Sequence, residues 1–229
     1  MPQPSFPKTN YEKARLYLHC MVEVKERMRI VQTMLDQPLQ PLFVQEICYL
    51  QFRYVCELIA IACLVAQGDY ETQRSFTESY KPPEIFKSLR GIYPDFFPEP
   101  VERIVTDEPG RPRSHHVERF HIQDAYNEED ITKLWHAAGT HLHRASVTKY
   151  LKATASKQPS LANIYKHVRG LVRLLGGHMI PLEETPQTEV RILVEMGKDD
   201  QPCRLMFLNI NHLDTTISIE EYTSEIVRG

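Results

Sequence analysis

The residues best suited to chemistry in this sequence are lysines and arginines, gathered in a stretch that has no acidic side chain. From Ile131 to Leu182 there is no Asp or Glu, while the same 52 residues carry eight fixed positive charges. These are Lys133, Arg144, Lys149, Lys152, Lys157, Lys166, Arg169 and Arg173. Because the whole chain has a net charge of -3, this segregation predicts a surface of one sign that attracts an anionic partner.

Most of these cations are predicted to project outward from two consecutive helices, at 146–157 and 160–175. The outward cations are Lys149, Lys152, Lys157, Lys166, Arg169 and Arg173. On antiparallel helices they would form one patch suited to phosphate backbones, which bind Lys and Arg without regard to base sequence. RNA or another polyanion is the leading partner. The alternatives are an acidic protein, a nucleotide, the acidic end of the chain itself, or solvent alone.

Histidines are the second group that could do chemistry, and six of the ten lie between residues 115 and 143. A helical zinc site needs two histidines four residues apart, whereas His136 and His143 are seven apart, about 10.5 Å along a helix axis. His141 and His143 point to different sides, and no carboxylate lies nearby to complete a coordination shell. We therefore expect no metal and no cofactor, and we interpret the histidines as solvated or facing an anion.

Signatures of nucleophilic or paired-carboxylate catalysis are missing from the sequence. No Ser, Thr or Cys lies in a recognisable catalytic motif, and no glycine-rich phosphate loop is found. The five cysteines, without a CxxC pair, are expected to be buried thiols, which suits a reducing cytosol. Without a signal core, or an apolar run near the ~20 residues of a membrane span, we expect a cytoplasmic protein with no membrane contact.

A mainly α-helical fold is predicted to position these residues: a helical bundle with a small C-terminal β-hairpin. The first helix begins near Thr9, whose spacing to Glu12 is that of a capping box. Its apolar seam has heptad spacing and consists of Ala14, Tyr17, Met21, Val24, Met28, Val31 and Leu35. This seam packs either in the chain's own bundle or across a homodimer.

The second predicted helix runs from about Leu42 to Gln67, with Gly68 as its C-cap, and is apolar nearly all round. It should therefore be the central helix. Glu46, Arg53 and Glu57 share one line of its surface and must either pair or border a wet cleft. A structural ion pair is one interpretation, and a cleft in which Arg53 meets an anion is the other.

The composition divides the chain into two regions. Residues 1–182 form the helical domain, with a proline-rich insertion at 92–126 that we expect to be irregular. Residues 183–229, with ten acidic and four basic side chains, form a small acidic β-ribbon packed on the helices. Its strands are expected at 189–196 and 203–210. On the last long helix, Tyr165 and Val172 are expected to face the core.

The segment Asn127 to Arg144, NEEDITKLWHAAGTHLHR, resembles the helix ending in G-x-x-L-H of HEPN-like bacterial helical proteins. The central helix with Arg53 and Glu57 is similar in style. The resemblance covers about a quarter of the chain. It implies an α-helical bundle, often dimeric, that is frequently tied to RNA cleavage or to defence against phage.

The same resemblance implies a catalytic motif in which an Arg precedes a His by a short spacer. None of positions 136–138 is Arg, so His143 lacks that partner, whereas Arg173 and His178 have the spacing and lie in the basic region. The implied catalytic residues of a metal-independent endoribonuclease are therefore Arg173, His178 and His143. The competing hypothesis is a non-catalytic, dimeric interaction protein whose acidic ribbon docks a partner.

Overall fold

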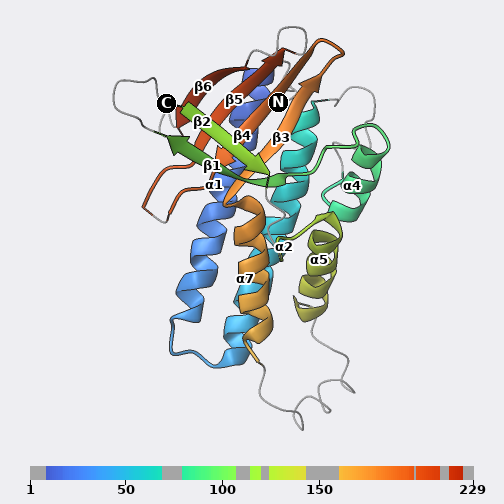
Figure 1. Cartoon of the computed structure of the whole chain (residues 1–229). Helices are drawn as coiled ribbons and strands as arrows, with labels where there is room; N and C mark the ends of the chain where they lie inside the picture. Colours follow the sequence, from blue (N-terminus) through green and yellow to red (C-terminus); the bar gives the residue numbers. More distant parts are fainter. Residues whose placement is uncertain are drawn as a thin grey trace, which may run out of the picture.

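The fold is that of a computed structural model, which describes residues 9–68, 79–106, 114–119, 124–142, 160–198, 200–211 and 217–223. In these ranges the chain forms long helices and an antiparallel sheet that lies across one end of them (Figure 1). Helices hold more of the described residues than strands do. The predicted class, mainly α with an added β part, is therefore confirmed.

Two long helices form the centre of the molecule: α1 (Asn10–Leu35) and α2 (Pro41–Gln67). The Thr9 side chain accepts from the Glu12 N–H, and the Glu12 carboxylate accepts from the Thr9 N–H, so the predicted capping box is present. Gly68 ends α2 with φ of 71°, a left-handed conformation that glycine adopts at no steric cost. The seam of α1 is buried or half-buried in the chain's own core, as the bundle interpretation predicts.

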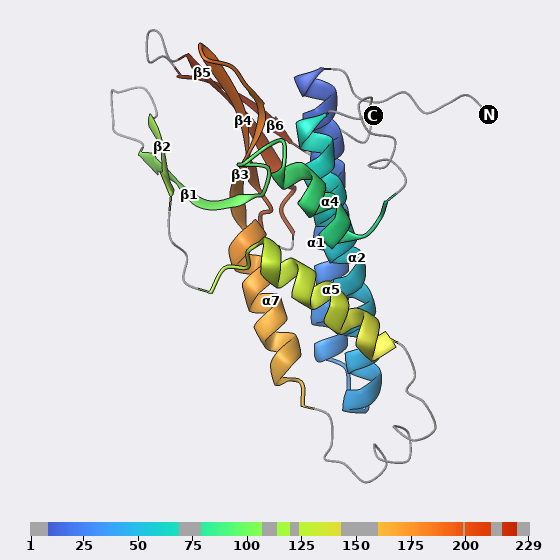
Figure 2. The ribbon, with the colours of Figure 1, turned by 90° about the vertical axis from the view of Figure 1, so that its right-hand side faces the viewer.

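Three shorter helices cover these two: α4 (Pro82–Arg90), α5 (Glu128–Leu142) and α7 (Ala162–Leu175). Helices α5 and α7 lie beside the first half of α2, away from the sheet (Figure 2). Asn127 caps the start of α5, because its Oδ1 accepts from the Asp130 N–H at 3.0 Å and the Asp130 carboxylate accepts from the Asn127 N–H at 3.2 Å.

The sheet has six strands in the order β2-β1-β3-β4-β5-β6, and every neighbouring pair is antiparallel. The strands are β1 (Glu99–Thr106), β2 (Ser114–Arg119), β3 (Gly177–Glu184), β4 (Thr188–Glu195), β5 (Arg204–Asn211) and β6 (Ile217–Thr223). The predicted pair of strands corresponds to β4 and β5, which pair along their whole lengths.

The sheet corrects two predictions. The insertion 92–126 is not irregular throughout, because β1 and β2 lie within it. The β-ribbon is also larger than a hairpin, and β3 runs across the boundary expected at 182/183. Prolines concealed these strands: Pro100 lies near the start of β1, and Pro181 lies beside an irregularity in the pairing of β3 with β4.

In the inner strands of the sheet, buried side chains lie on both faces. Ile192 and Val194 of β4 join the main core, as the alternation predicts, whereas Leu193 between them packs into a second, smaller cluster. The other members of that cluster are Val101, Met179, Met206 and Leu208. A two-stranded ribbon could not be covered on both faces, so the larger sheet explains why β4 and β5 are rich in apolar residues.

Helix α2 is long and apolar enough to cross a membrane by length and composition, the one such helix in the described part of the chain. In its most apolar 18-residue window, 61% of the residues are buried inside the fold. A central helix that contacts α1, α4, α5, α7 and β3 needs an apolar surface nearly all round. Its central position therefore accounts for its composition.

One buried polar pair fastens the sheet to α1. His178 of β3 is fully buried, and its Nε2 lies 2.8 Å from the Tyr17 hydroxyl of α1, while its Nδ1 lies 3.0 Å from the Leu175 carbonyl oxygen. The carbonyl can only accept, so Nδ1–H donates to it, and Nε2 is left to accept from the Tyr17 hydroxyl. Burial lowers the pKa of His178 to about 4, which keeps the imidazole neutral at pH 7.

This pair predicts a loss of stability in mild acid. His178 binds a proton near pH 6.5 in the unfolded chain, but only near pH 4 in the folded chain. The contribution of the neutral His178 to the free energy of unfolding is therefore complete above pH 6.5, and it is lost as the pH falls toward 4. At pH 5 the loss should be about 2 kcal/mol. Urea denaturation at pH 7.5 and 5.0 measures it, with His178→Gln as the comparison. An equal acid loss in the wild type and in His178→Gln would contradict the assignment.

Candidate functional site

Helix α7 carries the basic residues of the candidate site. Lys166 and Arg169 are exposed, and neither lies within 4 Å of a carboxylate of the described residues. Arg173, one turn further on, is half-buried, and its Nη1 lies 2.6 Å from Asp124 Oδ2. The predicted basic face of α7 is therefore present, and two of its three cations are available to an external anion.

A cavity of about 410 Å³ lies beside this face. Its lining consists of Asp124, Ala125, Tyr126, Asp130, Lys166, Arg169 and Gly170. The two acids in it already have partners: Asp124 is paired with Arg173, and Asp130 accepts from the Asn127 N–H. The two cations are thus the charged groups in the lining that lack a described partner.

Gly170 allows the loop before α5 to lie against α7. A Cβ at position 170 would lie 2.2 Å from Cε1 of Tyr126, far inside van der Waals contact. The Tyr126 N–H also donates to the Gly170 carbonyl at 3.2 Å. The tyrosine ring therefore packs on the helix backbone itself, which places it in the cavity wall beside Arg169.

Tyr126 also holds a histidine of α7. Its hydroxyl lies 2.6 Å from Nδ1 of His167, and burial raises the pKa of Tyr126 to about 12. Burial lowers the pKa of His167 to about 4, and the nearby positive charges of Lys166 and His141 add to the effect. Near pH 7 the phenol is therefore protonated and the imidazole neutral, and the tautomer of His167 sets which of the two donates.

Aromatic rings extend this contact into a layer that joins three helices. His141 of α5 stacks on Tyr49 of α2, with ring centroids 3.8 Å apart and planes 8° apart. His167 meets the rings of Tyr49 and Phe52 nearly edge-on. Burial lowers the pKa of His141 as well. His167 is therefore a neutral packing group at neutral pH, whereas His141 stacks on Tyr49 and remains exposed, in line with the expectation of solvated histidines.

The implied catalytic pair is not brought together. Arg173 points to Asp124 at the surface, whereas His178 is fully buried between α1 and β3 and has both ring nitrogens within hydrogen-bonding distance of internal partners. A histidine without solvent exposure cannot contact a phosphodiester, so the assignment of His178 as catalytic is wrong. The spacing between Arg173 and His178 gave a wrong prediction because Gly176 and Gly177 end α7 and lead the chain into β3, so the two residues lie on different elements.

Arg53 belongs to a structural ion pair, as one of the two interpretations predicted. Its Nε lies 3.2 Å from Glu57 Oε1, and the same carboxylate oxygen accepts from the Trp135 indole N–H at 2.9 Å. The guanidinium also lies over the Trp135 ring, 4.6 Å from the centroid. Arg53 does not line the α7 cavity, and its predicted role in binding an anion in a cleft of α2 stays a prediction.

The remaining predicted site residues lie outside the described part of the chain. These are His143, Lys149, Lys152 and Lys157. Among the residues that the structure does describe, no group of three or more His, Cys, Asp or Glu side chains could hold a metal ion.

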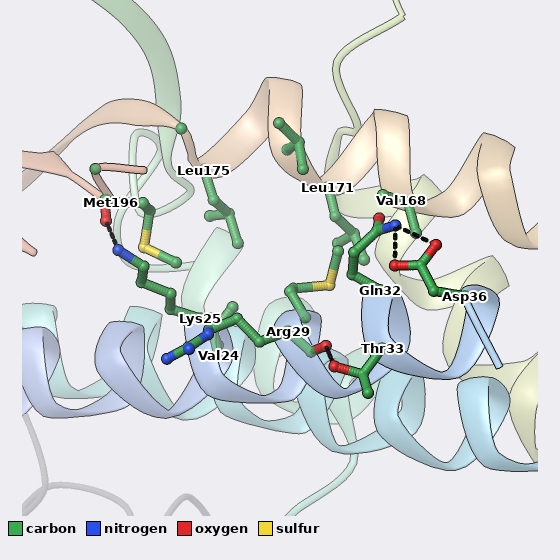
Figure 3. A pocket seen from close by; sticks show the side chains of 14 residues that line it. Val24, Lys25, Arg29, Gln32, Thr33, Asp36, Val168, Leu171, Leu175 and Met196 are labelled. Atoms are coloured by element: carbon green, nitrogen blue, oxygen red, sulfur yellow. Dashed lines mark hydrogen bonds between the residues drawn. The ribbon is translucent and has the colours of Figure 1, made fainter. Parts of the chain in front are cut away.

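A second cavity, of about 480 Å³, lies between α1 and α7, on the side of α7 that faces away from Lys166 and Arg169 (Figure 3). Val24, Leu171 and Leu175 point into it from the two helices. Lys25 at its end is occupied, because its Nζ donates to the carbonyls of Met196, Lys198 and Gln201 at 2.6–2.7 Å. This groove leaves Val172 57% exposed at its rim, which corrects the expectation that Val172 faces the core.

Three groups in the site were not found from the sequence: Tyr126, His167 and Gly170. Tyr126 and His167 are 41 residues apart in the chain, and no spacing rule joins a loop tyrosine to a helical histidine. Tyr165 was expected in the core and is instead 50% exposed, next to Lys166. A glycine in mid-helix was the one available signal, since it costs stability unless a close contact requires it.

No protein-family model, no curated protein and no solved structure matches this chain.

The Gly170 contact predicts an unusual response to alanine. In an ordinary mid-helix position Gly→Ala stabilises a helix by up to about 1 kcal/mol. Here Gly170→Ala should destabilise the fold by about 1–3 kcal/mol, because the new methyl group overlaps Tyr126. Gly91→Ala is the control, since the nearest atom to its Cβ would be 3.6 Å away. Thermal melts of both variants decide; a stabilised Gly170→Ala would show that the ring does not pack there.

Proposed function

We propose that this protein binds a phosphate-bearing polyanion, with RNA as the leading candidate, through the basic face of α7. The observation that carries the proposal is the exposure of Lys166 and Arg169, which have no described carboxylate partner. Phosphate oxygens are the natural counter-ions for such a pair, because each contact releases condensed cations from the nucleic acid. The run without acids from Ile131 to Leu182 means that no carboxylate of this segment competes with a phosphate for these cations.

Aromatic side chains near the cations support a nucleic acid over a small anion. Tyr165 is half-exposed on the helix turn that carries Lys166 and Arg169, and Tyr126 lies in the cavity wall. Aromatic rings beside a cationic stripe give bases a surface on which to stack. An acidic protein surface or a free phosphate has no base that could stack on these rings, so the rings would add nothing to its affinity.

Binding, and not cleavage, is the activity that the geometry supports. Arg173 and His178 are separated by the burial of the histidine, and His167 is neutral and tied to Tyr126. A HEPN-like ribonuclease activity in phage defence is therefore a proposal that would need His143 to act with another partner. A cytoplasmic location is a further proposal, supported by five buried cysteines without disulfides.

A second candidate function is a non-catalytic, dimeric interaction protein. The observation that favours it is the set of exposed apolar side chains on α2. The two functions are compatible, because α2's exposed residues and the cations of α7 belong to different helices.

Charge reversal on α7 tests polyanion binding. Lys166→Glu with Arg169→Glu should weaken binding to single-stranded RNA at least tenfold at low salt. The slope of log affinity against log salt should also fall by roughly 1.4, because two phosphate contacts are lost at about 0.7 each. Fluorescence anisotropy at several salt concentrations measures both effects.

The control is Lys87→Glu, the same charge reversal at one exposed lysine on α4, where the α7 variant reverses two cations. It should leave the salt slope unchanged. If the wild type does not bind RNA at low salt, or if the α4 variant loses as much affinity as the α7 variant, the proposal fails.

A further inference from the structure

An apolar stripe runs along the outer surface of α2, although α2 is the central helix. Phe43, Leu50, Tyr54 and Ile61 are respectively 49%, 36%, 39% and 37% exposed. At 100° per residue they lie within an arc of about 40°, and they extend over about 27 Å of helix. Single exposed apolar residues are ordinary, but four in line on one helix form a contact surface.

The spacing of the stripe suits another helix as its partner. With half-buried Ile47 included, the positions 43, 47, 50, 54 and 61 follow the a and d positions of a heptad repeat. Position 57 also belongs to this heptad series but holds Glu57, whose carboxylate pairs with Arg53 and accepts from the Trp135 indole N–H. Such a repeat packs knobs into holes against a second helix, so the partner surface is helical.

The same spacing is symmetric about residue 52. From Phe43 the steps along the four exposed residues are seven, four and seven, so the stripe has the same spacing from either end. An antiparallel copy of α2 would therefore set Phe43 against Ile61 and Leu50 against Tyr54 of the other chain. In a two-fold interface residue i of one chain contacts residue j of the other and the reverse, and this symmetric spacing allows such pairing, whereas an unrelated partner would not impose it.

Charges beside the stripe are compatible with a second copy. Arg27 of α1 lies over the Tyr54 ring, 4.3 Å from its centroid, and pairs with Glu23 of its own helix. The rim therefore carries both signs, and two copies would not repel each other. Ile30, 41% exposed and one turn from Arg27, adds apolar area from α1. That addition is needed, because a specific interface buries about 800 Å² per partner.

We infer that the protein forms a two-fold homodimer in which the α2 stripes of two chains pack antiparallel, with α1 at the rim. The inference uses none of the residues assigned to polyanion binding, so the two can fail separately. It also differs from a dimer through the seam of α1, which is occupied inside each chain.

Light scattering of the full chain tests the dimer. The wild type should have about twice the 26.7 kDa mass of the chain, and Leu50→Asp should be a folded monomer by circular dichroism and scattering. Ile92→Asp is the control, since Ile92 is 43% exposed but lies outside the stripe; it should stay dimeric. A wild-type monomer, or a Leu50→Asp dimer, would overturn the inference. A monomer that binds lipid vesicles through the stripe would also overturn it.

Cysteine cross-linking tests the orientation with milder changes, so the inference stays testable if Leu50→Asp does not fold. The native cysteines are all buried, so an introduced surface thiol reacts alone. An equal mixture of Leu50→Cys and Tyr54→Cys chains should form a disulfide between the two variants more readily than either variant forms one with itself. Preferred Leu50→Cys self-pairing would indicate parallel helices and would contradict the antiparallel arrangement.

Discussion

The need to cover α2 shapes the rest of this molecule. Few charges interrupt its 27 residues, and most of its surface has to be removed from water by other elements. Helix α1 packs along its length, α5 and α7 cover the half that begins at Pro41, and β3 meets the half that ends at Gln67. The Gln67 side chain shows how close this last contact is, since it donates to the Pro181 carbonyl from a buried position.

The polar groups that α2 carries into the core are matched by its neighbours. Glu57 accepts from both Arg53 and Trp135, and Trp135 comes from α5, so this network sets how α5 lies on α2. The stacked rings of Tyr49 and His141 add a second tie between the same helices. Helix α7 completes the layer through His167, and its opposite side, with Lys166 and Arg169, is left facing solvent. The position of the cations thus depends on the aromatic layer behind them.

Local sequence signals predicted the helices well because caps and periodicity are encoded within a few residues. Thr9 with Glu12, Asn127 with Asp130, and Gly68 all act where the sequence places them. The burial of α7 was predicted less well. Its spacing allowed Tyr165 and Val172 to face the core, but α7 stands apart from α1 across a groove, and that separation cannot be read from one helix. The strands β1 and β2 were missed because Pro100 in β1, and Pro109 and Pro112 between the two strands, are typical of loops.

The candidate site was only half visible in the sequence. Charge segregation identified Lys166, Arg169 and Arg173, since a run without acids needs no knowledge of the fold. The pairing of Arg173 with Asp124, and the contact of Tyr126 with His167 and Gly170, join segments more than 40 residues apart. The burial of His178 is likewise a tertiary fact, because its partner Tyr17 comes from α1, 161 residues away in the chain.

Lysine footprinting by mass spectrometry tests whether α7 is the face that binds a polyanion. Lys166 should react readily with an acylating reagent in the unbound protein and should be protected several-fold when single-stranded RNA is added. Lys87 of α4 should react equally in both conditions, and Lys25, whose Nζ is held by three carbonyl groups, should react slowly in both. Equal protection of Lys166 and Lys87, or no protection of Lys166 at saturating RNA, would contradict the account.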